Sequence, residues 1–381
     1  MKRIASLLFA AALAPVALAQ NALTRPAPPQ DRPLVILGAT LHPVSGPPIE
    51  RGAIRFEGGR IVALGETVPT QGAEIVDATG KHVYPGLFAA GTVIGLVEVQ
   101  AVRATVDVAE TGAINPNVRA EVAVNPDSEL IPVTRANGVL TVLTRPVAGA
   151  QGVITGSSAV LALDGWTGED LTLRSPVGLH VQWPSLVVSR ALPPPALEAA
   201  LKGQREKREA LERALEDAKA YRAAKAGGEV KRPDLRWEAM LPLLEGTLPL
   251  YVHADDVESI QAALDFTSRH GLRMVLMGGL EAWRVAPLLA ARDVPVIVAG
   301  THRLPLRRSD PFDAAYANPA RLHAAGVRFA IAGPGDAFGS ANERNLAYHA
   351  ATAAAYGLPP EEALKAITLY PAQITGVADR I

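Results

Sequence analysis

Residues 80–95 constrain the fold more than any other stretch of this 381-residue chain, because they separate two kinds of sequence pattern. Before them, short strand-like runs alternate with turn residues. Within them, Pro85 and Gly86 end the first unit, and an apolar run from Leu87 opens a longer one. After them, strand-like and helix-like segments alternate, as in an α/β fold. We therefore expect a small β-rich unit followed by a large α/β unit.

Short β-branched and apolar runs predict the strands of the first unit. Glycines such as Gly58, Gly59 and Gly72 separate these runs, as they do between the strands of hairpins. The predicted strands are 34–37, 53–56, 61–64 and 73–76. We expect them to form a small antiparallel sheet.

The overall charge excludes one class of partner. Lysine and arginine together number 37, and aspartate and glutamate number 38, so the chain lacks the basic excess that nucleic-acid binding needs. Cysteine is absent, which excludes disulfides and thiolate metal ligands.

The amino terminus has the pattern of a secretory signal peptide. A cationic start at Lys2 and Arg3 precedes an apolar run over 4–18, and the small residues Ala17 and Ala19 mark a cleavage site. A membrane anchor is the weaker interpretation, because a span needs about 20 apolar residues. We expect residues 1–19 to be removed, leaving a periplasmic or secreted protein that does not span the membrane.

The stretch around residue 80 resembles the entry strand of the amidohydrolase superfamily. That family's pattern, G-K-x-V-x-P-G-L-I-D-x-H-x-H, leads from a β-sandwich into a (β/α)8 barrel, and its first part is present here over 80–87. Residues 356–372 are similar to the family's closing segment, G-L-x-x-x-E-A-L-x-A-x-T-x-x-P-A. The resemblance implies an α/β fold: a (β/α)8 TIM barrel with a small N-terminal β-sandwich domain. Relatives continue past the place of Ile381 with a segment that finishes the sandwich, so we expect either an incomplete sandwich or a shortened sequence.

These expectations divide the chain into a signal peptide, a linker, an accessory domain and a barrel. The ranges are 1–19, 20–33, 34–86 and 87–381. Near 195–227, apolar residues recur at helical spacing among many charges, which predicts a charged helical insertion in the barrel. A solvated helix and a docking arm for a partner are both open interpretations, and the first is favoured.

The resemblance implies a zinc site, but most of its ligands are replaced in this sequence. The two histidines of H-x-H fall on Gly91 and Val93, and a later histidine falls on Gly278. At the place of the family's T-D, where aspartate is both ligand and general base, stand Gly333 and Pro334. His253, in a strand ending His-Ala, is the one position that keeps its zinc ligand.

Three further residues are weaker candidates for the site. His180 lies near the place of the family's bridging lysine, and His302 follows a predicted strand at the active-site face. Asp336 stands two residues beyond the expected aspartate and is a candidate catalytic base. The alternative interpretations are a packed histidine, a loop histidine and a turn residue.

Two functions remain open. The resemblance implies a hydrolase of C–N bonds in cyclic amides, amidines or related small molecules, catalytically impaired here because a catalytic zinc needs about three protein ligands. The alternative is a non-catalytic binding protein, or an inactive subunit that forms a homo-oligomer or pairs with an intact amidohydrolase. In both cases the partner is a small molecule. The Gly-rich stretch 149–158 matches no nucleotide-binding motif and lacks the G-x-S-x-G elbow of serine hydrolases.

Overall fold

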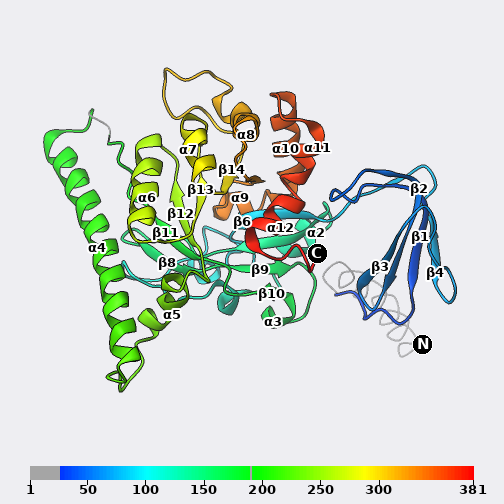
Figure 1. Ribbon diagram of the computed structural model, residues 1–381, viewed down its shortest axis with the longest axis horizontal. Helices are drawn as coiled ribbons and strands as arrows, with labels where there is room; N and C mark the ends of the chain where they lie inside the picture. The colour runs from blue at the N-terminus through cyan, green and yellow to red at the C-terminus, as the bar shows by residue number, and fades with distance from the viewer. Residues whose placement is uncertain (1–25, 189–190) are drawn as a thin grey trace, which may run out of the picture.

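A computed structural model describes residues 26–188 and 191–381, and Figure 1 shows a small sheet beside a larger body of strands and helices. The predicted signal peptide, 1–19, lies outside the described residues. Export therefore stays a prediction.

The accessory unit is a five-stranded sheet. Its strands are β1 (Leu34–Leu41), β2 (Ile49–Glu57), β3 (Arg60–Gly65), β4 (Glu74–Asp77) and β5 (His82–Val83). Strands β1, β2 and β3 are antiparallel neighbours, but β4 and β5 run parallel to β1. The expected purely antiparallel sheet is therefore wrong. The β2–β3 hairpin occupies one edge of β1, so the chain crosses to the other edge and pairs there in the same direction.

The larger unit is built on strands that form two hydrogen-bonded sheets. These strands are β6 (Leu87–Thr92), β7 (Val139–Thr144), β8 (Ile154–Ser157), β9 (Ala159–Ala162), β10 (Thr172–Arg174), β11 (Leu179–Gln182), β12 (Leu250–Ala254), β13 (Met274–Gly278), β14 (Val296–Ala299) and β15 (Phe329–Ala332). One sheet has the order β10-β9-β7-β6 and the other β15-β14-β13-β12-β11-β8. Only Ser158 separates β8 from β9, so this segment joins the two sheets. At the other end, β15 lies beside β6.

Alternate side chains of these strands enter two different apolar clusters, which defines an inside and an outside. In β12, Leu250 and Val252 belong to the larger cluster, which includes residues of the helices, whereas Tyr251 belongs to the smaller one. The smaller cluster also contains Phe88 of β6 and Ile297 of β14. Side chains from β6, β7, β9 and β12 to β15 therefore surround a common interior, as in a barrel.

One barrel position departs from the regular (β/α)8 pattern. The segment β8–β9 runs antiparallel to both of its neighbours, β11 and β7. Only residues 145–153 connect β7 to β8, and a parallel crossover needs about a dozen residues or more. The stretch 149–158, interpreted from sequence as a Gly-rich loop, thus contains a strand.

Helices surround the barrel and follow its strands. They are η1 (Arg103–Thr105), η2 (Ala120–Ala123), α2 (Leu130–Arg135), α3 (Gly168–Leu171), α4 (Pro194–Ala226), α5 (Leu235–Leu244), α6 (Val257–Arg269), η3 (Ala282–Val285), α7 (Ala286–Ala291), α8 (Ala314–Ala324), α9 (Ala337–Ser340), η4 (Glu343–Asn345), α10 (Leu346–Ala355), α11 (Pro360–Lys365) and α12 (Leu369–Thr375). Helix α4 lies in the range where the sequence predicts a charged helix, and it runs along one edge of the molecule (Figure 1). Its buried residues, from Leu211 to Ala218, are all in its second half. No helix in the described part of the chain is both long and apolar enough to cross a membrane.

Candidate functional site at the mouth of the barrel

Two of the candidate histidines meet inside the barrel. His180 of β11 and His253 of β12 place Nδ1 and Nε2 2.9 Å apart, which is a hydrogen bond between the two rings. The ring of His180 also stacks on Tyr251, with centroids 4.9 Å apart. We call His180 and His253 the histidine pair.

The histidine pair is uncharged at neutral pH. Burial lowers the pKa of both imidazoles well below the ordinary value, and the positive charge of Arg145 lowers both further. Each neutral ring has one N–H and one bare nitrogen, so one ring donates and the other accepts. The hydrogen bond therefore uses a nitrogen of each ring that a metal would otherwise need.

Three glycines stand at the barrel mouth where the superfamily pattern has metal ligands, and neighbouring side chains fill the space beside each. A Cβ on Gly91 would overlap Met277 Cε. A Cβ on Gly278 would lie 2.6 Å from Asp255 Oδ1, and a Cβ on Gly333 would lie 2.7 Å from Glu343 Oε2. In each case the contacting atom is the end of a neighbouring side chain, so a larger residue fits only if that neighbour shifts.

The residues at the barrel mouth do not fit a catalytic zinc site. Such a site needs about three protein ligands held around one point. Within residues 26–188 and 191–381, no group of three or more His, Cys, Asp or Glu side chains is placed to hold an ion. The donor set is reduced to the histidine pair, whose facing nitrogens bond each other.

Asp336 and His302 have other partners. Asp336 Oδ1 accepts a 2.6 Å hydrogen bond from the Gly339 backbone N–H and caps α9. His302 is exposed, its Nε2 lies 2.8 Å from Thr352 Oγ1, and its ring lies 4.3 Å from that of His349. The contacts of His302 are thus with α10, and the structure does not bring it to the histidine pair.

The sequence reasoning missed two residues at the barrel mouth, Arg145 and Glu343. Arg145 directly follows β7, and its Nη2 donates to the Gly335 carbonyl at 3.1 Å. Burial lowers its pKa to about 10, although the negative charges of Asp336 and Glu343 oppose this. Its position after a predicted strand was a usable signal, since barrel active sites lie at the carboxyl ends of strands.

Glu343 of η4 is almost completely buried, with 1% of its surface exposed. Neither carboxyl oxygen has a hydrogen-bond partner in the described part of the chain. Burial raises the pKa of Glu343 to about 8, and nearby Thr92 and Arg145 oppose this rise only in part. The carboxyl group is therefore largely protonated at neutral pH.

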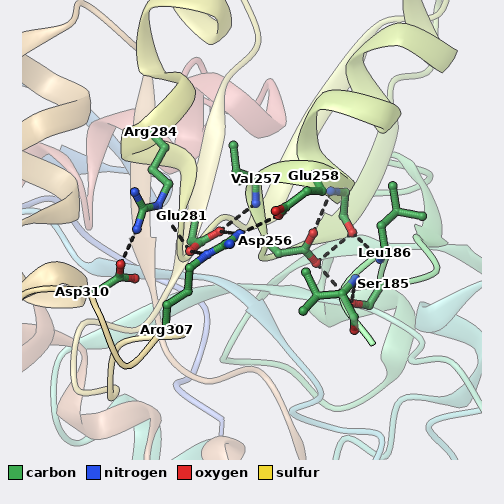
Figure 2. A network of polar contacts seen from close by, with 11 residues as sticks. Ser185, Leu186, Asp256, Val257, Glu258, Glu281, Arg284, Arg307 and Asp310 are labelled. Carbon is green, nitrogen blue, oxygen red and sulfur yellow. Dashed lines mark hydrogen bonds and ion pairs between the residues drawn. The ribbon is translucent and has the colours of Figure 1, made fainter. Parts of the chain in front are cut away.

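Glu281 stands three residues after Gly278, the position where the superfamily pattern has a histidine, and it has a structural role. It accepts from Arg307 Nε at 2.6 Å and from the Val257 backbone N–H at 2.9 Å (Figure 2). Burial alone would raise the pKa of Glu281, but these hydrogen bonds outweigh it and hold the pKa below its ordinary value. Glu281 thus ties the connection between β14 and α8 to the start of α6.

A well-defined cavity lies away from the barrel mouth. It is an apolar groove of about 760 Å³ on the outer side of the barrel, between β7 and helices α10 and α11. Leu140, Ala350 and Leu364 are among its lining residues, and no charged side chain lines it. Its lining is apolar apart from Tyr84, so the groove lacks the cluster of polar groups that a catalytic site needs.

The fold defines a class: a barrel of strands and helices with an accessory β-sheet. Comparison with solved structures agrees. An amidohydrolase from Thermotoga maritima MSB8 superposes with a TM-score of 0.78 at 26% identity, covering 91% of this chain and 89% of that one. A molinate hydrolase superposes with a TM-score of 0.50 at 14% identity, covering 93% of this chain and 87% of that one, which supports the fold alone.

Sequence comparison adds a short match. An N-acyl-D-aspartate deacylase from Alcaligenes xylosoxydans xylosoxydans is 40% identical over 58 residues, which are 15% of this chain and 12% of the deacylase. No protein-family profile matches the sequence. The structural similarity places the chain in the amidohydrolase superfamily, and it confirms the resemblance and the fold class expected from the sequence.

Proposed function

We propose that this amidohydrolase-superfamily protein is catalytically impaired and that its barrel mouth binds a small molecule. The observation that supports this most is the filling of the former ligand positions. Met277, Asp255 and Glu343 occupy the space beside Gly91, Gly278 and Gly333.

The chemistry of the mouth agrees with this proposal. Hydrolysis of a C–N bond in this superfamily depends on water made nucleophilic by a bound metal, which three or more fixed ligands must hold. The histidine pair is neutral and bonded to itself, and Asp336 is engaged as a helix cap. The ring nitrogens that remain are too few to hold a metal at one point.

A substrate panel with a matched variant tests the proposal. The named relatives suggest N-acyl-D-aspartates and molinate as substrates, and cyclic amides complete the set. We expect no turnover above that of His253→Ala, with or without added zinc. Zinc-dependent hydrolysis that disappears in His253→Ala, while the variant stays folded by circular dichroism, would contradict the proposal.

A second candidate role is that of an inactive subunit beside an intact amidohydrolase or a second copy. The favouring observation is the accessory sheet, whose outer strands expose large apolar side chains such as Ile61 at 62% and Ile75 at 47%. Co-expression with an intact amidohydrolase from the same source, followed by light scattering on the separated species, tests it. A complex of fixed stoichiometry supports the subunit role, and two separate monomers exclude it.

A further inference from the structure

Several buried polar atoms at the barrel mouth have no hydrogen-bond partner in the described part of the chain. They include Arg145 Nε, His180 Nε2 and both carboxyl oxygens of Glu343. Buried polar groups in native proteins are nearly always paired, so each such atom requires an explanation. Several of them in one region indicate a site that a polar ligand completes.

Arg145 and Glu343 are complementary, yet they do not pair with each other. Each affects the pKa of the other, so they lie within electrostatic reach. No ion pair joins them among the described residues, which places the guanidinium nitrogens and the carboxyl oxygens more than 4.0 Å apart. Both groups lie against the same loop after β15, with Arg145 Nη2 beside Gly335 and Glu343 Oε2 beside Gly333.

The surrounding structure holds both groups in place. Arg145 Nη2 is fixed by the Gly335 carbonyl. The Glu343 carboxyl lies against the backbone of Gly333, where only a glycine leaves room for it. Arg145 is partly exposed as a residue, while its Nε is buried.

We propose that Arg145 and Glu343 bind the carboxylate group of a small organic acid. Arg145 donates N–H groups to the carboxylate, and the protonated carboxyl of Glu343 donates to it from the other side. This inference rests on the proposed binding role and names the chemical class of its ligand.

The charges of the site favour a monocarboxylate over other anions. A guanidinium matches a carboxylate in geometry and charge, with parallel N–H···O bonds. A phosphate would bring about two negative charges close to the carboxylate of Asp336, whereas a monocarboxylate brings one. The neutral histidine pair adds no positive charge. A monocarboxylate therefore meets less charge repulsion at this site than a phosphate does.

Calorimetric titration with matched probes tests the inference. The probes are acetate, propionate and butyrate, each with its neutral amide as the control. We expect saturable binding of at least one carboxylate and at least about tenfold weaker binding of the matching amide, because the amide loses the charge-assisted hydrogen bonds.

Variants identify the groups that bind. Arg145→Gln is expected to weaken carboxylate binding at least about tenfold, and Arg145→Lys, which keeps the charge but loses the fork, to weaken it less. Glu343→Gln keeps a hydrogen-bond donor and should retain binding, whereas Glu343→Leu should lose it. The control is Arg303→Gln, which also removes one positive charge but does so near Asp255. This variant should bind carboxylates like the wild type.

Three results would overturn the inference. They are equal affinity for acid and amide, wild-type binding by a folded Arg145→Gln, and no saturable binding of any carboxylate in the series. If Arg145→Gln fails to fold, Arg145→Lys and Glu343→Leu carry the test. Zinc-dependent hydrolysis would instead overturn the proposed function, whether or not carboxylates bind, so the two failures are distinguishable.

Discussion

At the scale of single residues, Gly91 connects the loss of the metal site to backbone geometry. Its φ is +122°, a conformation that residues with a side chain rarely adopt, and Met277 closes the space where a side chain would begin. A histidine at this position would thus meet both a backbone and a packing penalty. Placing a histidine at Gly91 alone is therefore not expected to restore a metal site, because Met277 stands in the way.

Gly91→Ala tests this coupling. We expect a loss of unfolding free energy of about 2–4 kcal/mol, since about 1–2 kcal/mol comes from the backbone and the rest from overlap with Met277. Gly80→Ala is the matched control, because Gly80 also has a positive φ, +75°, but nothing within 4 Å of its Cβ position. Urea denaturation measures the unfolding free energy of both variants. An equal loss in both would show that overlap with Met277 contributes nothing.

The carboxyl group of Glu343 predicts a pH dependence of stability. Its pKa is raised from 4.5 to about 8, so the folded chain keeps a proton that the unfolded chain releases within this window. Stability should therefore fall as the pH rises from about 4.5 to about 8, by up to about 1.4 kcal/mol per pH unit. Glu343→Gln removes this contribution. Urea denaturation between about pH 5 and about pH 9 should give a shallower slope for the variant, and parallel slopes would show that Glu343 titrates normally.

At the scale of elements, the connections after the strands determine the barrel mouth. The loop from β15 to η4 brings Glu343 to the space beside Gly333, and Ser340 of α9 holds this loop to β6 through Thr92, with the two hydroxyl oxygens 3.1 Å apart. The connection from β14 to α8 is held by Arg307, which pairs with Glu281 and Glu258 (Figure 2). These loops and the ends of strands β6 and β13 therefore both contribute to the difference from a metal site.

Arg307→Met tests how firmly the β14–α8 connection is held. Glu281 is only 1% exposed, so removal of Arg307 leaves a buried carboxylate short of a partner. We expect the free energy of unfolding to fall on the order of 2 kcal/mol. Breaking a fully buried ion pair costs about 3–5 kcal/mol. The loss is smaller here because Glu281 keeps Arg284 and the Val257 N–H as partners. Adding Glu281→Gln should recover part of the loss.

The control for this test is Arg328→Met. Arg328 pairs with Asp293 at the surface, where both side chains are more than half exposed, and such a pair contributes at most about 1 kcal/mol. Equal losses for Arg307→Met and Arg328→Met in thermal unfolding would mean that Glu281 does not depend on Arg307.

The elements differ in how far the sequence could predict them. Buried parallel strands are apolar runs bounded by turn residues, which is why the strands at 139–144 and 274–278 could be located from the sequence. Strand β8 was missed because Gly152 and Gly156 resemble a loop, although Gly156 allows Val118 to approach its backbone closely. His253 was found through its motif, whereas Glu343 carries no local signal. Its role depends on a contact with Gly333 that only the folded chain creates.

At the scale of the whole molecule, the chain keeps the architecture of its superfamily and replaces the groups at the barrel mouth. The similarity to the Thermotoga maritima amidohydrolase extends over 91% of the chain, so it includes the accessory sheet and the barrel together. The interior cluster, from Phe88 to Val377, consists of apolar side chains and Tyr251. We therefore expect the fold to be stable without a metal.

Export of the protein is a separate prediction at this scale. We expect cleavage after Ala19, so that the mature chain begins at Gln20. Mass spectrometry of the protein from a periplasmic fraction gives the first residue directly. An intact Met1 in the cytoplasmic fraction would contradict the prediction, and Ala19→Arg, which blocks a small-residue cleavage site, provides the control.

The central claim is that the former ligand positions no longer form a metal site, and the metal content of the purified protein tests it most directly. Elemental analysis after dialysis against zinc, manganese and cobalt is compared with that of the His180→Ala, His253→Ala double variant. We predict well under one ion per chain for both proteins, with melting temperatures unchanged by added metal. One or two ions per chain in the wild type, absent from the double variant and accompanied by a higher melting temperature, would contradict the account.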